Sequence, residues 1–377
     1  MLHKTIRWLK AKLPHRLKQK LKEKTGLGST AHDTSVFTKI DLEKKMINIA
    51  IHVGGGLGDF VVYKAIFTEL LKIENCCLSL FTLSYENTNT IIGNMKNIHI
   101  YYAMAYRKKM PFDVFLEIDH YIKVKEINIS SLKKKSKALY EMLNKIIQYN
   151  EQHIPSTNNV LTQRNSIIFR AKYLGLNRWS QLSCGGIFDM SAMRSQIELD
   201  INRKEIIAKY GLVGNGYITI SCGADIDMGG MKQTKIWPID KYSELTLKIK
   251  TMFPKLKVVQ LAQKNEPHAK NVDVVIQEND FENVKILLSE AKTHVSNEGG
   301  LVHVATQLGI QCIVIFGPTP VHYYGYPSNI NIESPFCSGC MEVNYEWFTK
   351  CPRSFEKAMC MDNISVEMVF NALKNIL

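Results

Sequence analysis

Short apolar runs alternate along this chain with amphipathic stretches, and this alternation restricts the possible folds more than any other feature. Runs typical of buried strands lie at residues 47–53, 78–83, 98–102 and 114–118, and again at 217–222, 257–261, 272–276, 294–296 and 312–316. Helical periodicity fills intervals at 59–72, 239–252, 281–291 and 301–308. Strands that alternate with helices form parallel sheets covered by helices, so the sequence predicts an α/β fold of two doubly wound domains. Two such domains in tandem place a ligand cleft at the carboxyl ends of both sheets.

The length of 377 residues agrees with two domains, because a single domain usually holds about 100–200 residues. The predicted segments are a basic amphipathic extension (1–45), an N-terminal Rossmann-like domain (46–200) with a polar helical insertion (131–175), a C-terminal domain (205–336), a cysteine-rich segment (337–361) and a last helix (362–377).

The net charge of +13 is concentrated in two places. Residues 1–24 carry a charge of +8, and Ser131–Lys137 adds four lysines without an acid. The rest of the chain is then close to neutral, at about +1. Because a nucleic-acid-binding protein needs a basic surface on its folded body, this distribution excludes nucleic acid as the partner.

Residues 1–24 have the pattern of a basic amphipathic helix. Ile6, Leu9, Leu13, Leu17 and Leu21 recur at steps of three or four, with lysines between them. Such a helix binds an anionic membrane surface, or it packs on its own domain, and the pattern agrees with both. No apolar signal-peptide core and no run of ~20 apolar residues occurs. Together with an odd number of cysteines, nine, this predicts a cytoplasmic protein. If residues 1–24 bind a membrane, the expected surface is the cytoplasmic face of the inner membrane.

The first strand ends in a glycine turn, Gly54–Asp59 (GGGLGD), where a helix begins. Glycines let the backbone approach a ligand closely, and a helix N-terminus offers free N–H groups. A dinucleotide fingerprint needs a third glycine at position 59, which is Asp, so a nucleotide-dependent oxidoreductase is disfavoured. Asp59 has two interpretations: it caps the helix, or it faces the cleft as a carboxylate base.

A second loop with suitable chemistry ends in Thr234-Lys235, just before Trp-Pro and a helix. The lysine can meet a diphosphate as a point charge and the threonine can add a hydrogen bond, although a surface lysine is the simpler interpretation. Asp225-Ile226-Asp227, in the same loop, has the spelling of a cation-binding motif. We interpret it as loop chemistry, with cation binding as the alternative.

A third motif, Glu298-Gly299-Gly300, again joins a strand end to a helix. The two glycines allow backbone N–H groups to point at phosphate oxygens, and Glu298 can accept hydrogen bonds from a ribose. His303 lies one turn into the helix. A lone histidine is more often a structural residue than a catalyst, so we favour that interpretation, with ligand contact second.

Four cysteines cluster late in the chain, at Cys337, Cys340, Cys351 and Cys360. The opening C-x-x-C and the spacing are typical of a tetrahedral site for zinc or iron. Two disulfides are disfavoured in the cytoplasm, and four unconnected thiols are the remaining alternative. Because no histidine or open ligand position is implied, the predicted role is structural.

With these motifs the chain resembles glycosyltransferase family 9, the heptosyltransferase-like family with the GT-B fold. The resemblance runs from about residue 46 to the C-terminus and rests on IAIHVGGGLGDFVVYKAI, TKIWP and HVSNEGGLVHVATQLGIQCIVIFGPT. The four cysteines, which follow YYGYPSNINI, are similar to the cysteine finger of a subset resembling autotransporter heptosyltransferases.

The resemblance implies that Asp59 is the catalytic base. It also implies a nucleotide-sugar site made of Gly56, Gly58, Thr234, Lys235, Glu298, Gly299, Gly300 and His303. Two positions depart from the family's D-[ST]-G pattern, because Glu298 replaces the Asp and Gly299 the Ser or Thr. These departures bear on the choice of nucleotide or sugar.

The activity implied by the resemblance is that of an inverting glycosyltransferase that needs no catalytic metal. It would move a heptose from ADP-heptose onto an acceptor hydroxyl of lipopolysaccharide or another surface glycan. Two alternatives stay open: a protein O-heptosyltransferase acting on Ser or Thr in the cytoplasm, and a nucleotide-sugar-binding protein without turnover. The sequence also leaves the oligomeric state open, a homo-oligomer included.

Overall fold

A computed structural model describes residues 46–102, 110–199, 203–223, 234–277 and 280–377. Ile47–Leu377 forms one compact unit. The predicted N-terminal amphipathic helix and the Asp225–Asp227 motif lie outside the described residues. The account below therefore concerns this unit.

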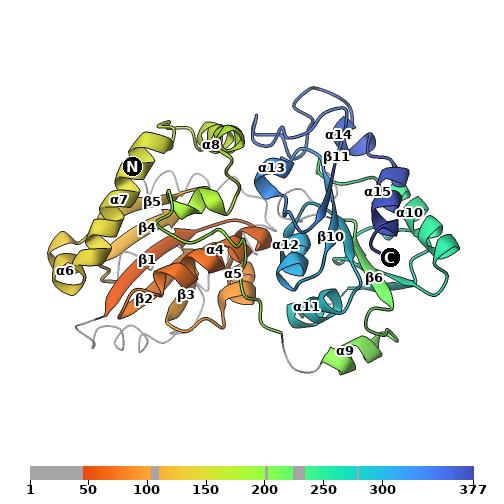
Figure 1. The fold of residues 1–377 in the computed structure, drawn as a ribbon, viewed down its shortest axis with the longest axis horizontal. Helices are drawn as coiled ribbons and strands as arrows, with labels where there is room; N and C mark the ends of the chain where they lie inside the picture. The colour runs from red at the N-terminus through yellow and green to blue at the C-terminus, as the bar shows by residue number, and fades with distance from the viewer. Residues whose placement is uncertain (1–45, 103–109, 200–202, 224–233, 278–279) are drawn as a thin grey trace, which may run out of the picture. The chain divides into compact units, whose positions relative to one another are not determined.

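The first sheet has five strands in the order β3-β2-β1-β4-β5 (Figure 1). Its strands are β1 (Ile47–Val53), β2 (Cys76–Thr82), β3 (Ile98–Tyr102), β4 (Val114–Ile118) and β5 (Ile122–Ile127). The first four are parallel, and β5 runs antiparallel to β4 at the edge. The strand order reverses direction between β1 and β4, and the carboxyl end of strands at such a point is where doubly wound sheets bind ligands.

The second sheet has six strands in the order β11-β10-β9-β6-β7-β8, and all of them are parallel. They are β6 (Tyr217–Ser221), β7 (Lys257–Leu261), β8 (Val274–Ile276), β9 (His294–Asn297), β10 (Cys312–Phe316) and β11 (Ile330–Glu333). Here the order reverses between β9 and β6. The motifs at Thr234–Lys235 and Glu298–Gly300 follow these two strands in the chain.

Helices connect the strands in both halves. They are α4 (Leu57–Leu70), α5 (Tyr85–Ile92), α6 (Ile129–Lys135), α7 (Lys137–His153), α8 (Val160–Leu174), α9 (Arg203–Lys209), α10 (Ile239–Met252), α11 (Phe281–Ser289), α12 (Gly300–Gln307), α13 (Val321–Tyr324), α14 (Met359–Asp362) and α15 (Val366–Lys374), with a short 3-10 helix, η2 (Ser180–Ser183). The predicted α/β architecture of two parallel-rich sheets is thus confirmed.

Two strands, β5 and β11, were missing from the predicted set. β5 alternates apolar and charged residues (IKVKEI) at a sheet edge, so it contains no apolar run. The predicted insertion at 131–175 is helical, as expected. Four of its buried residues belong to the main hydrophobic core (Leu132, Leu139, Leu143 and Ile146), whereas Ile168 and Ala171 pack in a smaller cluster with Tyr323.

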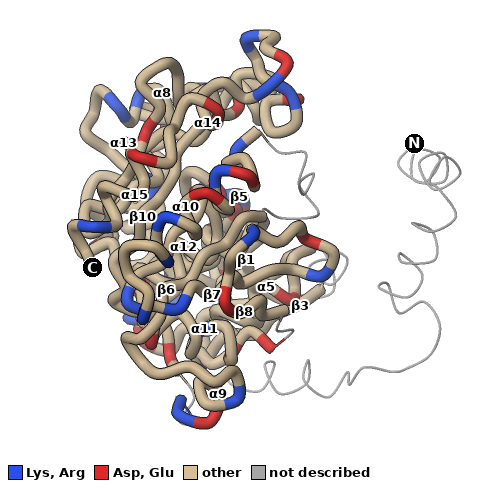
Figure 2. Tube along the Cα trace, turned by 90° about the vertical axis from the view of Figure 1, so that its right-hand side faces the viewer, with Lys and Arg blue, Asp and Glu red and all other residues tan. Residues whose placement is uncertain are grey.

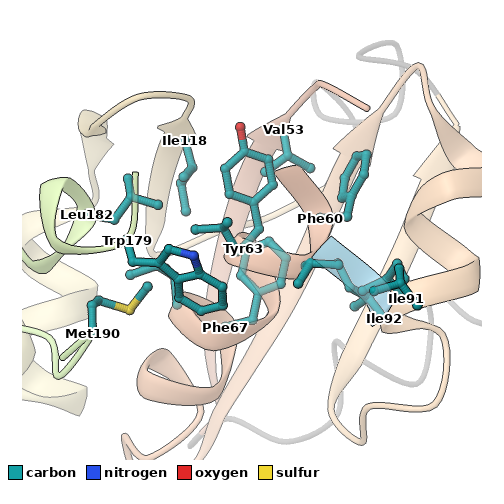
Figure 3. Close-up of a cluster of buried hydrophobic side chains, with 14 of the residues drawn as sticks. Val53, Phe60, Tyr63, Phe67, Ile91, Ile92, Ile118, Trp179, Leu182 and Met190 are labelled. Atoms are coloured by element: carbon teal, nitrogen blue, oxygen red, sulfur yellow. The ribbon is translucent and has the colours of Figure 1, made fainter. Parts of the chain in front are cut away.

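The core beneath α4 fixes the position of this helix. Phe60, Tyr63 and Phe67 lie three and four residues apart, so they share one face of the helix and are fully buried. Trp179 and Met190, from the segment after α8, pack into the same cluster (Figure 3). Because these side chains of α4 and of the segment after α8 are all buried, their packing fixes the position of α4 at the end of the first sheet.

The predicted lysine cluster in the first half has structural partners. Lys133–Lys135 occupy the last turn of α6, where positive charge is favourable, and Lys135 lies 2.9 Å from Asp113. Over the face shown in Figure 2, basic and acidic positions of the described chain are interspersed. Within those described ranges, no helix is both long and apolar enough to span a membrane.

Candidate active site

The glycine turn after β1 builds a helix cap around Asp59. The Oδ2 atom of Asp59 accepts a hydrogen bond of 3.0 Å from the N–H of Gly56, which closes the first turn of α4. Gly55 has a φ of +134°, and a Cβ there would lie 2.4 Å from the same oxygen, so only glycine fits. The Asp59 side chain is still 32% exposed. Capping and a cleft-facing carboxylate are therefore compatible.

The first turn of α4 contacts the first turn of α12, which belongs to the other sheet. A Cβ on Gly58 would lie 2.4 Å from Cδ2 of His303, and one on Gly300 would lie 2.8 Å from Cβ of Leu57. Both glycines thus permit close packing between the two halves. Their predicted contact with a nucleotide sugar stays a prediction, and it is not needed to explain why glycine stands there.

Glu298 is the centre of a buried polar group at the end of β9. Its carboxylate lies 3.3 Å from Nζ of Lys235 and 3.4 Å from Nε2 of His303. Burial alone would raise the pKa of Glu298, but Lys235 and His303 outweigh it and lower the pKa to about 2. Glu298 is therefore ionised at neutral pH and offsets the charge of Lys235.

His303 has protein partners on both ring nitrogens. Nδ1 lies 2.7 Å from the hydroxyl of Tyr326, and Nε2 faces Glu298. A neutral ring that donates from Nε2 and accepts at Nδ1 satisfies all three groups. This is the structural role that the sequence favours for His303, which also shapes the contact with Gly58.

Of the remaining predicted binding residues, Gly56 and Gly299 border open space, whereas Thr234 already has a protein partner. A Cβ on Gly56 would meet nothing within 4 Å, and one on Gly299 would meet only a carbonyl at 3.8 Å, so both glycines border open space. The hydroxyl of Thr234 instead donates to the carbonyl of Trp347 at 2.7 Å. In this arrangement its proton is not available to a diphosphate.

The sequence did not point to Arg178, which contacts the candidate base directly. Its Nη2 atom donates to Oδ1 of Asp59 at 3.2 Å and to the hydroxyl of Tyr63 at 3.1 Å, and its side chain is 2% exposed. A single arginine in a turn after α8 carries no motif, and more than a hundred residues separate it from Asp59. Only the tertiary structure brings the two together.

A second unpredicted group lies between α8 and the cysteine-rich segment. Arg164 pairs with Asp119 at 2.6 Å and with Glu342 at 3.5 Å. Glu342 is buried at a φ of +60°, and burial raises the pKa of its carboxyl to about 7. This contact joins the cysteine-rich segment to the first half of the unit.

The four late cysteines lie in one neighbourhood as free thiols. Burial, together with the nearby Cys337, Cys340 and Cys351, raises the pKa of Cys360 to about 12. Across the ranges that the structure describes, however, no three His, Cys, Asp or Glu side chains are arranged closely enough to hold a metal ion. The donor chemistry suits zinc or iron, whereas the tetrahedral geometry predicted from the spacing is not present in this arrangement.

Comparison with known proteins adds to this geometry. The family model for glycosyltransferase family 9 (heptosyltransferase) matches residues 125–334, more than half of the chain. The chain belongs to glycosyltransferase family 9. As a member of this family it is a glycosyltransferase, as the sequence predicts. No curated protein matches the sequence.

Solved structures of bacterial glycosyltransferases are similar to this chain at low sequence identity. TibC, a bacterial iron-containing dodecameric glycosyltransferase from enterotoxigenic E. coli H10407, is 14% identical over 88% of this chain and 79% of its own, with a TM-score of 0.58. A complex of TibC with ADP-D-beta-D-heptose gives the same identity and TM-score over 88% and 76% of the two chains. The E. coli ADP-heptose lipopolysaccharide heptosyltransferase II is 12% identical over 87% and 98%, with a TM-score of 0.46. The likeness to TibC shows that the family 9 chain has the GT-B fold.

Proposed function

We propose that this family 9 glycosyltransferase moves a heptose from ADP-heptose onto an acceptor hydroxyl, with inversion at the anomeric carbon. Family membership supports the reaction class. The donor is inferred from TibC, which shares the fold and has been solved with ADP-D-beta-D-heptose. A lipopolysaccharide or other surface glycan is the proposed acceptor.

The observation that carries the proposal is the contact of Gly58 with His303. Asp59 follows Gly58 in the chain, so it lies next to a contact between helix α4 of the first sheet and helix α12 of the second. His303 in turn touches Glu298, which pairs with Lys235. A series of contacts therefore connects the turn that carries Asp59 with the Glu298–Lys235 pair, which supports a shared role for these two groups.

The proposed chemistry divides between these two groups. Asp59 removes the proton of the acceptor hydroxyl as the oxygen attacks the anomeric carbon, which is general-base catalysis. The bond from that carbon to the diphosphate breaks, and the leaving group departs with its electron pair. Lys235 and the N–H groups at the start of α12, beside Gly299, stabilise the negative charge that develops.

The test offers the purified enzyme ADP-heptose, ADP-glucose, UDP-glucose and GDP-mannose in parallel. Each donor is supplied with heptose-free lipopolysaccharide or with a Ser/Thr-containing peptide, and mass spectrometry follows nucleotide release and the mass of the product. We expect ADP-heptose with the lipopolysaccharide to give the fastest transfer. Transfer to the peptide alone would identify the protein-modifying alternative, and the absence of turnover with every pair would support the non-catalytic one.

Two variants test the assigned roles in the same assay. Asp59→Asn should lose at least about 100-fold in kcat while donor binding persists, because an amide cannot take the proton of the acceptor hydroxyl. Lys235→Ala should lower kcat/KM by about 10- to 1000-fold, because a charge-stabilising group is removed. Full activity in Asp59→Asn would reject its role as the base.

We also propose that Cys337, Cys340, Cys351 and Cys360 hold one structural zinc or iron ion. The shared neighbourhood of the four thiols supports this, as does the iron described in TibC. When bound, the ion would link the cysteine-rich segment internally and keep its four thiolates charged. No step of the transfer depends on it.

A further inference from the structure

A buried cation, Arg178, contacts the proposed base Asp59, and the transfer chemistry proposed above gives it no role. The guanidinium of Arg178 lies 5.3 Å from the ring centre of Tyr63 and shares its Nη2 atom between that residue's hydroxyl and Asp59. Burial works against its charge, while Tyr63 and Asp59 raise the pKa of Arg178, and the net shift is upward. Arg178 is therefore charged at every relevant pH.

The backbone around Arg178 holds this guanidinium in place. The side-chain oxygen of Asn177 accepts hydrogen bonds from the N–H groups of Trp179 and Ser180, at 3.0 and 2.9 Å. The indole of Trp179 is buried in the core beneath α4 (Figure 3). The N–H of Arg178 itself donates to the carbonyl of Tyr323, in the other half, at 2.8 Å. The Asn177 turn, the buried Trp179 and the hydrogen bond to Tyr323 together fix the position of the Arg178 backbone.

The rest of the guanidinium is poorly satisfied. Its Nε and Nη1 atoms are buried and have no hydrogen-bond partner in the part of the chain that the structure describes. A buried donor without a partner destabilises the folded state, and a buried charge does so more strongly. Such groups in native structures call for an explanation, and a catalytic role is one of the usual ones.

We propose that Arg178 is a positioning residue for the transfer reaction. Its guanidinium holds Oδ1 of Asp59 while the N–H of Gly56 holds Oδ2, at 3.2 and 3.0 Å. Two fixed points set the plane of the carboxylate, and its remaining lone pairs are left for an acceptor hydroxyl. This inference rests on the proposed function, because it assumes that Asp59 is the base.

Stability and activity separate this role from a structural one. Arg178→Met leaves the Asp59 carboxylate without this partner, but that side chain is 32% exposed and can be hydrated, so the variant should melt within about 2 °C of the wild type. Removing the partner leaves the charge uncompensated, so Asp59→Asn should melt lower, and Arg178→Met should restore part of that loss. If Arg178 served mainly to stabilise the fold, Arg178→Met would melt lower than Asp59→Asn.

The experiment measures ADP release from ADP-heptose with the acceptor, heptose-free lipopolysaccharide or Ser/Thr peptide, that supports wild-type turnover. Arg178→Met should lower kcat by about 10- to 100-fold and leave the donor KM within about twofold. Arg178→Lys keeps the positive charge but lacks the planar guanidinium, so its kcat should lie between those of the wild type and Arg178→Met. In an Asp59→Asn background, Arg178→Met should cause no further loss. Arg194→Met, at an exposed arginine, is the matched control and should match the wild type.

Each outcome decides between named alternatives. Wild-type kcat in a folded Arg178→Met protein overturns the positioning role and leaves the proposed function intact. If Arg178→Met does not fold, Arg178→Lys carries the test, and a folded Arg178→Lys protein with wild-type kcat has the same meaning. If the wild type turns over no donor with either acceptor, the proposed function fails and this inference fails with it.

Discussion

The contact between Gly58 and His303 leads to a prediction about activity without a large loss of stability. In a Gly58→Ala variant the new Cβ would lie 2.4 Å from Cδ2 and 2.9 Å from Nε2 of His303. An ordinary carbon–carbon contact needs about 3.5–4.0 Å, so the two helix starts must separate by roughly 1 Å. His303 cannot easily turn away, since it is buried and bonded to Tyr326 and Glu298.

The two expected effects differ in size. Overpacking costs about 1–3 kcal/mol, and the better helix propensity of alanine offsets about 1 kcal/mol of it. The melting temperature should therefore fall by no more than about 4 °C, at roughly 2 °C per kcal/mol for a large unit. A displacement of about 1 Å between Asp59 and the Glu298–Lys235 pair should lower kcat/KM by about 100-fold.

The assay combines ADP release from ADP-heptose with a thermal melt of the same preparation. Gly54→Ala is the control, because a Cβ there would meet nothing within 4 Å and the substitution lies in the same turn. We expect Gly54→Ala to keep wild-type values in both measurements. If Gly58→Ala kept full activity, the contact would not set the distance between the two groups. An equal loss in Gly54→Ala would mean that any change in the turn is harmful.

Three further predictions concern other parts of the chain. The pKa of Glu298 is about 2 in the folded protein against an ordinary 4.5, so its stabilising contribution is present above pH 4.5 and is lost as the pH falls towards 2; melts of Glu298→Gln over this range should lack that acid dependence, and an unchanged dependence contradicts the assignment. Elemental analysis of the purified protein should find one zinc or iron per chain, and Cys337→Ser should bind less and melt lower; a wild type without either metal argues against the site. Vesicles with anionic lipid should carry the full chain upward in a flotation gradient, and a variant without residues 1–24 should stay at the bottom, whereas equal flotation of both would exclude that segment as the contact.

Much of the fold follows from local sequence pattern. β1, β3, β4, β7 and β10 have the predicted bounds, because each is an apolar run that ends in turn residues. β5 was missed because an edge strand buries one face only, and its lysines obscured the run. Local pattern therefore finds an edge strand such as β3, which is a mostly apolar run, but misses one such as β5, in which charged residues alternate with apolar ones.

The sequence pointed to Asp59 and Lys235 because each stands in a motif that carries its own chemistry, and their roles stay predictions. The site was not predictable where the chemistry arises from packing. Arg178 and Glu342 lie in turns with no distinctive pattern, and each meets its charged partner across more than a hundred residues. The packing of Gly58 and Gly300 was hidden for the same reason, since a glycine turn looks alike whether a ligand or a helix approaches it.

The interlocked starts of α4 and α12 also limit how this enzyme can be recombined. Gly58 accommodates His303, and Gly300 accommodates Leu57, so two pairs of positions match across the two halves. A chimera that takes its first half from another family member and its second half from this chain inherits one member of each pair. Exchanging donor or acceptor specificity by swapping halves would then require that residues 57, 58, 300 and 303 be transferred as a set.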